Sequence, residues 1–147
     1  MATLLALNLN KCVSYAITRI RQQVKKKRNA HPHKKHKITD YPSMVVACGY
    51  VKRVDTFWSQ SASPINYHYS HKIEQRLEER LGIIGSKRNG CKNIIGACAE
   101  PHAADKVIKA FPGCKLGELQ FSDAYRPRTA QRKKNCQNCK DAFPEVL

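Results

Sequence analysis

The sequence predicts an α/β fold, and two kinds of hydrophobic pattern support this prediction. A continuous apolar run at 44–51 is typical of a buried strand, and a second run at 54–59 predicts its partner in a β-hairpin. Further along, Ile73, Leu77 and Leu81 recur every four residues, with charged side chains on the other faces, as in an amphipathic helix. A chain of 147 residues suits one domain with a modest core.

The second half of the chain continues the alternation of helix and strand. Pro101 is tolerated in the first turn of a helix, which the Pro112-Gly113 pair would end. Residues 116–121 predict another strand, and 122–134 predict a long, polar and basic loop.

The charge is strongly positive and unevenly distributed. Lysine and arginine number 27 against 11 acidic residues, which gives a formal net charge of +16. No acidic residue precedes Asp40, whereas ten lysines and arginines do. This balance favours a polyanionic partner, and we expect nucleic acid rather than a merely soluble, ribosome-like basic protein.

Residues 1–40 are predicted to form a basic N-terminal helix and linker, ahead of a domain at 41–147. The apolar stripe within 2–20 is followed by its positive charges, which reverses the order of a signal peptide, and polar residues interrupt it too often for a membrane span. The absence of acidic residues at its start is also typical of a mitochondrial presequence. The basic run at 25–28 is also typical of a nuclear localisation signal. We favour a docked helix, no membrane span and an intracellular site of action.

Three cysteines and a glutamate have the spacing of a catalytic zinc site. Cys98 and Glu100 lie two apart at one predicted helix start, and Cys136 and Cys139 lie three apart at another. Three thiolate ligands leave the fourth tetrahedral position open for water, which is the pattern of a catalytic zinc. Glu100 beside that water could move its proton as a general acid and base.

Seven cysteines, an odd number, argue against a framework of disulfides. The remaining four are most simply core or surface thiols, although Cys91 is a rival zinc ligand and Cys114 a weaker one. With a fourth protein ligand the zinc would be structural. The protein would then be a non-catalytic, basic module that binds zinc and nucleic acid.

The two motifs together resemble the signature of the zinc-dependent cytidine deaminase superfamily. The wider wording around Cys98-Ala99-Glu100 and Cys136-Gln137-Asn138-Cys139 is most similar to the deaminase domains of bacterial polymorphic toxins. The resemblance covers about 44–143, and it departs from the usual pattern at Asn135, where a proline is common. It implies a deaminase-like α/β/α sandwich with a leading β-hairpin and a small mixed sheet.

The resemblance also implies an activity, which is hydrolytic deamination of a nucleobase with Zn²⁺ as cofactor. A cysteine-led motif is similar to that of enzymes acting on free cytidine, whereas the toxin-like wording and the charge favour DNA or RNA. We therefore expect cytosine in nucleic acid as substrate, with adenine left open and a free-cytidine deaminase as an alternative. A toxin or delivered effector of this kind would have an immunity protein as partner.

Two further groups of residues are candidates for contacts with the substrate. By the resemblance, the segment between the second strand of the hairpin and the helix that carries the first motif lines the pocket. Its candidates to bond or stack on a flipped base are Asn66, Tyr67, His68 and Tyr69. The basic loop leads directly into Cys136. Its candidates to contact the nucleic-acid backbone are Arg126, Arg128, Arg132, Lys133 and Lys134. The alternatives are a loop that caps the core and a solvated loop.

Overall fold

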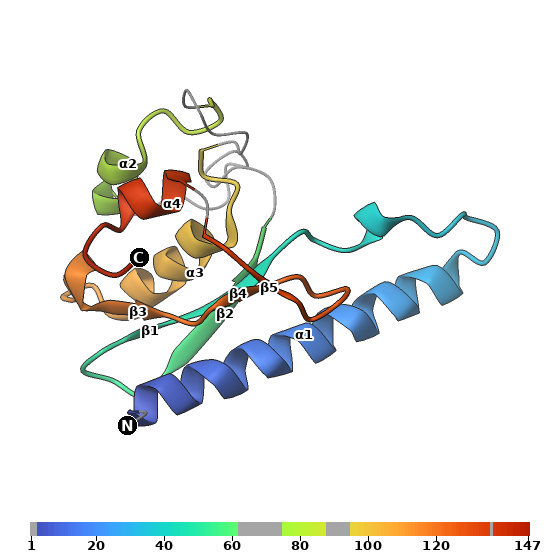
Figure 1. The fold of residues 1–147 in the computed structure, drawn as a ribbon, viewed down its shortest axis with the longest axis horizontal. Helices are drawn as coiled ribbons and strands as arrows, with labels where there is room; N and C mark the ends of the chain where they lie inside the picture. Colours follow the sequence, from blue (N-terminus) through green and yellow to red (C-terminus); the bar gives the residue numbers. More distant parts are fainter. Residues whose placement is uncertain (1–2, 62–74, 88–94, 136) are drawn as a thin grey trace.

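The computed structural model describes residues 3–61, 75–87, 95–135 and 137–147. Within these ranges a five-stranded sheet has one long helix on one face and three shorter helices on the other (Figure 1). The α/β class is confirmed.

The leading hairpin consists of β1 (Val45–Tyr50) and β2 (Thr56–Gln60), which pair antiparallel. β1 is the central strand, and its residues alternate between two cores. Val46 and Cys48 pack against the three-helix side, whereas Val45 and Ala47 pack against the long helix. Burial on both faces explains why this strand is a continuous apolar run in the sequence.

The other side of β1 is taken by β3 (Leu119–Phe121) and β4 (Ala124–Tyr125), and β5 (Arg132–Lys133) pairs with β4. The strand order is β2-β1-β4-β5, with β3 also on β1. We expected a mixed sheet, but every strand pair among the described residues is antiparallel. The central strand β1 runs opposite to β2 on one side and opposite to β3 and β4 on the other.

A β-bulge separates β3 from β4. Cys48 lies opposite Phe121 but Val45 lies opposite Tyr125, so the second strand carries one extra residue. Ser122 bridges the break, since its Oγ accepts a hydrogen bond from the backbone N–H of Ala47 at 2.9 Å. The predicted strand at 116–121 is accordingly shorter, because its first turn is the 3₁₀ helix η2 (Leu116–Glu118).

The long helix α1 (Leu4–Ala30) lies along one face of the sheet and extends beyond it (Figure 1). Its buried stripe, at positions three or four apart, is Leu5, Leu9, Val13, Ala16, Ile20 and Val24. The helix continues well past the apolar run at 2–20. Arginine, glutamine and lysine, which follow that run, are all good helix formers. The linker that follows contains η1 (Ile38–Asp40).

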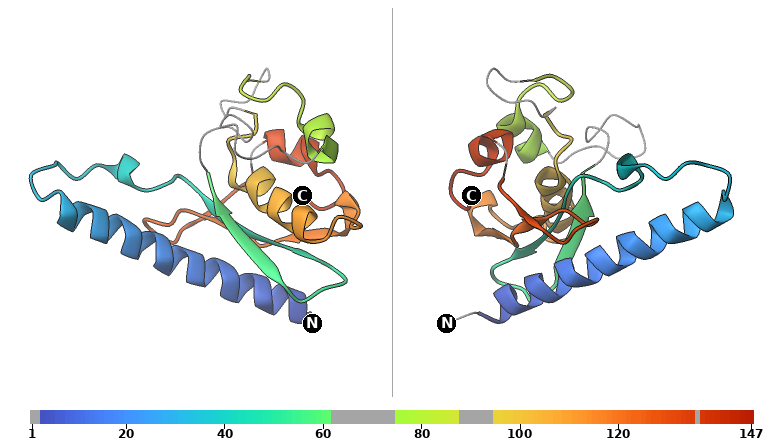
Figure 2. Two further views of the ribbon diagram at one scale, coloured as in Figure 1. Left: turned by 180° about the vertical axis from the view of Figure 1, so that it is seen from behind. Right: turned by 45° about the vertical axis from the view of Figure 1, so that its right-hand side comes forward.

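The opposite face is covered by α3 (Ala99–Ala110), with α2 (Gln75–Leu81) and α4 (Gln137–Ala142) beside it (Figure 2). Gly82 follows α2 with φ of 91°, a left-handed conformation that suits glycine and ends the helix as predicted. At the sheet edge, Lys106 of α3 donates a hydrogen bond to the carbonyl of Trp58 in β2 at 2.7 Å.

Among the described residues, no helix combines the length and apolar character that crossing a bilayer requires.

Candidate metal centre

The first part of the site is the N-terminus of α3. Cys98 is the N-cap residue, with the extended backbone (φ −68°, ψ 158°) that such a position requires, and Glu100 lies in the first turn. The alanines Ala99, Ala103 and Ala104 are buried in the core and let α3 lie close to the sheet. The helix start is therefore held in place by packing, and its dipole favours negatively charged groups there.

The second part is α4, which carries Cys139. Two contacts fix this short helix. Phe143 is buried against Phe121 of β3, with ring centroids 5.1 Å apart, and Arg80 of α2 pairs with Glu145 at 2.6 Å. These contacts bring the first turn of α4 to the N-terminus of α3.

Cys98, Glu100 and Cys139 meet where these two helices begin. One ligand atom from each, two sulfurs and one carboxylate oxygen, lies within 4.8 Å of the others. The exposed fractions are 7% for Cys98 and 0% for Glu100 and Cys139. The thiol of Cys139 donates a hydrogen bond to Oε2 of Glu100 at 2.8 Å. The predicted convergence of the two motifs is thus seen for these three residues.

The donor set suits a divalent metal. Thiolate and carboxylate are both zinc ligands, and zinc sites are usually four-coordinate. A fully buried carboxylate is rare unless it is paired or binds a metal, because removing its charge from water is costly. The side chains of Cys98, Cys139 and Glu100 therefore fit a divalent metal ion such as zinc.

The remaining sequence-predicted residues of the pocket lie outside the described residues. These are Cys136, Asn66, Tyr67, His68 and Tyr69, together with the rival ligand Cys91.

The weaker rival Cys114 is described, and it is not part of the metal-ligating group. It is buried in the hydrophobic core together with Cys48. Burial raises the pKa of the Cys48 thiol, which keeps it neutral. Neither thiol therefore supplies the fourth ligand of a closed site.

The basic loop is a hairpin built from β4 and β5, and its residues fall into two groups. Arg132, Lys133 and Lys134 line an open hollow of about 440 Å³ together with Lys140. Arg132 also lies 3.4 Å from Asp123, so part of its charge is neutralised. Lys140 follows Cys139 directly in the chain, but Lys140 is exposed whereas Cys139 is buried, and the residues of the candidate metal centre do not line the hollow.

Arg126 and Arg128 lie at the turn of the same hairpin, beside α1. Their side chains are exposed. The turn is held by Arg21 of α1, whose Nε donates to the carbonyl of Pro127 at 2.8 Å. Neither arginine lines the hollow, and the turn that carries them contacts α1.

Sequence reasoning missed two features of the site. Lys140 was not singled out, although its place next to a ligand cysteine was a usable signal. The close approach of the Glu100 carboxylate to the sulfurs of both Cys98 and Cys139 was also missed. Spacing along the chain does not show in which direction a side chain points.

Comparison of the chain with protein-family models, curated proteins and solved structures finds no match. The resemblance to the cytidine deaminase superfamily therefore rests on the two motifs alone.

Proposed function

We propose that the protein is a zinc-dependent hydrolytic deaminase that acts on a nucleobase in DNA or RNA, with cytosine preferred over adenine. The single observation that supports this proposal best is the buried meeting of Cys98, Glu100 and Cys139 at two helix starts. Residues from both motifs, Cys98 and Glu100 from the first and Cys139 from the second, lie within 4.8 Å of one another through their ligand atoms, which supports the interpretation of the motifs as a catalytic zinc site. The leading hairpin is also what the deaminase resemblance implies, whereas the helical layer on the second face of the sheet is α1, which lies outside the stretch that the resemblance covers.

Cys98, Cys136 and Cys139 are the proposed ligands. A zinc ion held there supplies a Lewis acid that makes water nucleophilic near neutral pH. Glu100 is the proposed general acid and base. Its carboxylate, buried at the start of α3, takes a proton from the attacking water and passes it to the ring nitrogen of the base.

The reaction balances as addition of water and loss of ammonia. Oxygen adds to the ring carbon that carries the amino group, and the C–N bond to that group then breaks. Glu100 then moves one proton, taken from the added hydroxyl group, to the departing nitrogen, which leaves as ammonia. The base keeps the oxygen as a carbonyl, so cytosine becomes uracil.

The choice of a polymer over a free nucleoside rests on charge. The hollow that Lys140 helps to line contains four cationic side chains and a single acid, Asp123. A free nucleoside carries no phosphate for these groups to neutralise, whereas a nucleic-acid strand carries one per nucleotide. The toxin role, and with it an immunity protein that covers the pocket, rests on the resemblance alone.

One observation favours a second candidate function. A carboxylate oxygen of Glu100 lies within 4.8 Å of the sulfurs of Cys98 and Cys139, close enough for the three atoms to bind one metal ion. Glu100 could therefore be a metal ligand itself. The site would then be closed by Glu100 and Cys136, and the protein would be a zinc module that binds nucleic acid without chemistry.

The deciding experiment compares the zinc-loaded protein with its Glu100→Gln variant. Each is incubated with single- and double-stranded DNA, RNA and free cytidine, and C-to-U and A-to-I conversion is read by sequencing or mass. We expect conversion on a polymer. It should fall by about a hundredfold or more in the variant, which should retain zinc, since general acid–base groups contribute about 10²–10⁴ in rate.

Three results would overturn the proposal. Full activity in Glu100→Gln would remove the assigned acid and base. Conversion of free cytidine alone would identify a nucleoside deaminase. No conversion on any substrate, with zinc retained by the wild type and lost from Glu100→Gln, would establish the non-catalytic module in which Glu100 is a ligand.

A further inference from the structure

A second basic cavity lies at the far end of α1, between its last turns and the linker that folds back alongside it. The cleft has a volume of about 490 Å³, within the range of ligand sites. Its lining holds four lysines, one arginine and two histidines, against one acid, Asp40, and one apolar residue, Val24. It lies in the part of α1 that projects beyond the sheet (Figure 1).

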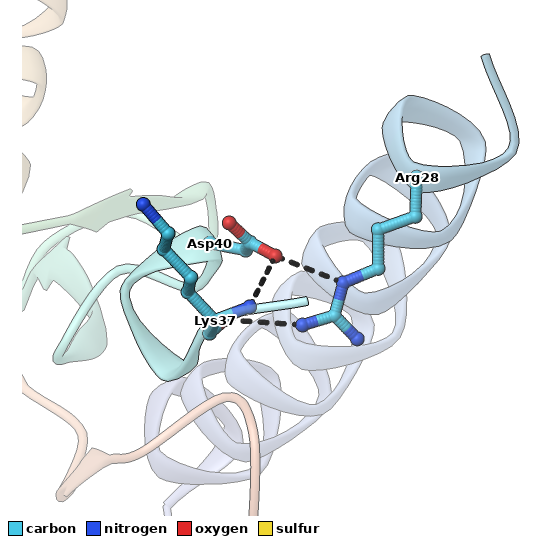
Figure 3. Close-up of polar contacts among 3 residues, drawn as sticks. All are labelled: Arg28, Lys37 and Asp40. Atoms are coloured by element: carbon cyan, nitrogen blue, oxygen red, sulfur yellow. Dashed lines mark hydrogen bonds and ion pairs between the residues drawn. The ribbon is translucent and has the colours of Figure 1, made fainter. Parts of the chain in front are cut away.

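The walls of the cleft are held together by one ion pair. Asp40 Oδ2 accepts a hydrogen bond from Nε of Arg28 at 3.0 Å and another from the backbone N–H of Lys37 at 3.0 Å (Figure 3). Arg28 also donates to the carbonyl of Lys37 at 3.1 Å, and its guanidinium lies 5.3 Å from the ring centre of Tyr41. These bonds tie the linker to the helix and lower the pKa of Asp40.

The ion pair with Arg28 neutralises the negative charge of Asp40, which is the single acidic residue in the lining. Lys27, Lys34 and Lys35 are exposed and make no ion pair among the described residues. The contact of Lys37 with Asp40 comes from the backbone N–H of Lys37 (Figure 3). Four like charges around one cavity repel each other, and an anion placed between them would relieve that repulsion.

We infer that this cleft binds the phosphodiester backbone of a nucleic-acid strand, at a site separate from the candidate metal centre. A concave lining with several lysines suits a chain of phosphates. A membrane surface fits less well, because an interfacial helix buries a continuous apolar face, whereas here Val24 is buried in the protein and Ile38 is a single exposed apolar side chain beside the cleft. The choice of nucleic acid over other polyanions rests on the proposed function. The positive charge of the cleft does not depend on that proposal.

The test uses fluorescent oligothymidylate as the probe. Thymine carries no exocyclic amino group, so the probe cannot be deaminated, and its binding reports on contacts to the backbone. The cleft variant is Lys27→Ala/Lys34→Ala/Lys35→Ala. The matched control, Lys11→Ala/Lys25→Ala/Lys26→Ala, removes the same charge from exposed lysines of α1 that do not line the cleft.

We expect the cleft variant to bind about tenfold more weakly or worse, and the slope of log affinity against log salt to fall by about 2, as loss of three backbone contacts requires. The control should change both much less. Equal losses in the two variants would show diffuse attraction to net charge and overturn the site. So would unchanged binding in both variants, or loss of binding to phosphatidylserine vesicles without loss on oligothymidylate. Circular dichroism and melting curves of each variant establish that the fold is kept.

The outcome is independent of the deaminase assay. If no base is converted but the cleft variant still loses oligothymidylate binding, the proposed function fails and the cleft stands. If bases are converted while the cleft variant binds oligothymidylate like the wild type, the proposal for the cleft is wrong and the proposed deaminase function is supported.

Discussion

The Cys139 thiol lies 2.8 Å from Glu100 Oε2 and donates its hydrogen to it, which links the start of α4 to the start of α3. Both groups are fully buried. Binding of zinc by Cys139 requires the thiolate, so the shared proton must leave. The pair thus connects the metal occupancy of the site to the protonation of the group that we propose as its acid and base.

Replacement of either described cysteine ligand should remove the metal. We expect Cys98→Ser and Cys139→Ser to lose zinc and activity, because serine is not among the usual zinc ligands. Cys12→Ser should retain both, since Cys12 lies on α1 and outside the metal-ligating group. Metal analysis and thermal melting check this. A stoichiometric zinc ion in Cys139→Ser would contradict the ligand set.

The basic hollow should affect polymers and not nucleosides. We expect Lys133→Ala/Lys134→Ala to raise KM for oligonucleotide deamination by about tenfold at physiological salt, because backbone contacts are lost. The kinetics on free cytidine, if any, should not change. Lys11→Ala/Lys115→Ala removes equal charge from exposed lysines elsewhere and is the control. A similar rise in KM for the control would show that the hollow has no special role.

The thiol of Cys12 should be less reactive than its partial exposure implies. Burial raises its pKa, while a hydrogen bond with Thr56 and the nearby Lys106 oppose the shift. Alkylation needs the thiolate, so its pH midpoint should lie above the ordinary value of about 8.5. Lys106→Met should move the midpoint higher still, because it removes the positive charge. Site-resolved mass spectrometry of iodoacetamide labelling measures this, and a midpoint at or below the ordinary value would refute it.

The helix α1 should contribute to the stability of the whole fold. Leu9 is 1% exposed in the core between α1 and the sheet, whereas Leu7 on the same helix is 48% exposed. We expect Leu9→Ala to lower the free energy of unfolding by about 2–5 kcal/mol. Leu7→Ala should change it by about 0.5 kcal/mol or less. Urea unfolding followed by two probes distinguishes these outcomes. A separate early transition, with the main one unshifted, would show that α1 unfolds independently.

The hairpin, the helix ends and the two ligand-bearing helix starts could all be predicted from the sequence, because each depends on local patterns. The continuous apolar run at 44–51 is typical of a buried strand, and Gly82 marked a helix end. The length of α1 was missed because its charged second half has no apolar periodicity apart from Val24. Only packing against the sheet shows that this residue continues the stripe.

The site was predictable in its composition and not in its geometry. Spacing placed Cys98 and Glu100 together, but the approach of Cys139 depends on Phe143 and Arg80, which hold α4 through contacts far apart in the sequence. The cleft at the end of α1 was equally hidden. The basic tract was visible, yet its concave shape arises from one pair, Arg28 with Asp40.

The contact between Lys106 and Trp58 also has a consequence for how molecules of this protein meet one another. β2 is the outer strand on its side of the described sheet, and such a strand offers unpaired backbone groups to any passing chain. Here the carbonyl of Trp58 is already bonded to an ammonium group, which also lies 5.5 Å from the indole ring centre. A second molecule that tried to add a strand would have to displace this charge. Along β2, this contact therefore makes the outer edge of the described sheet less favourable as a template for fibre growth.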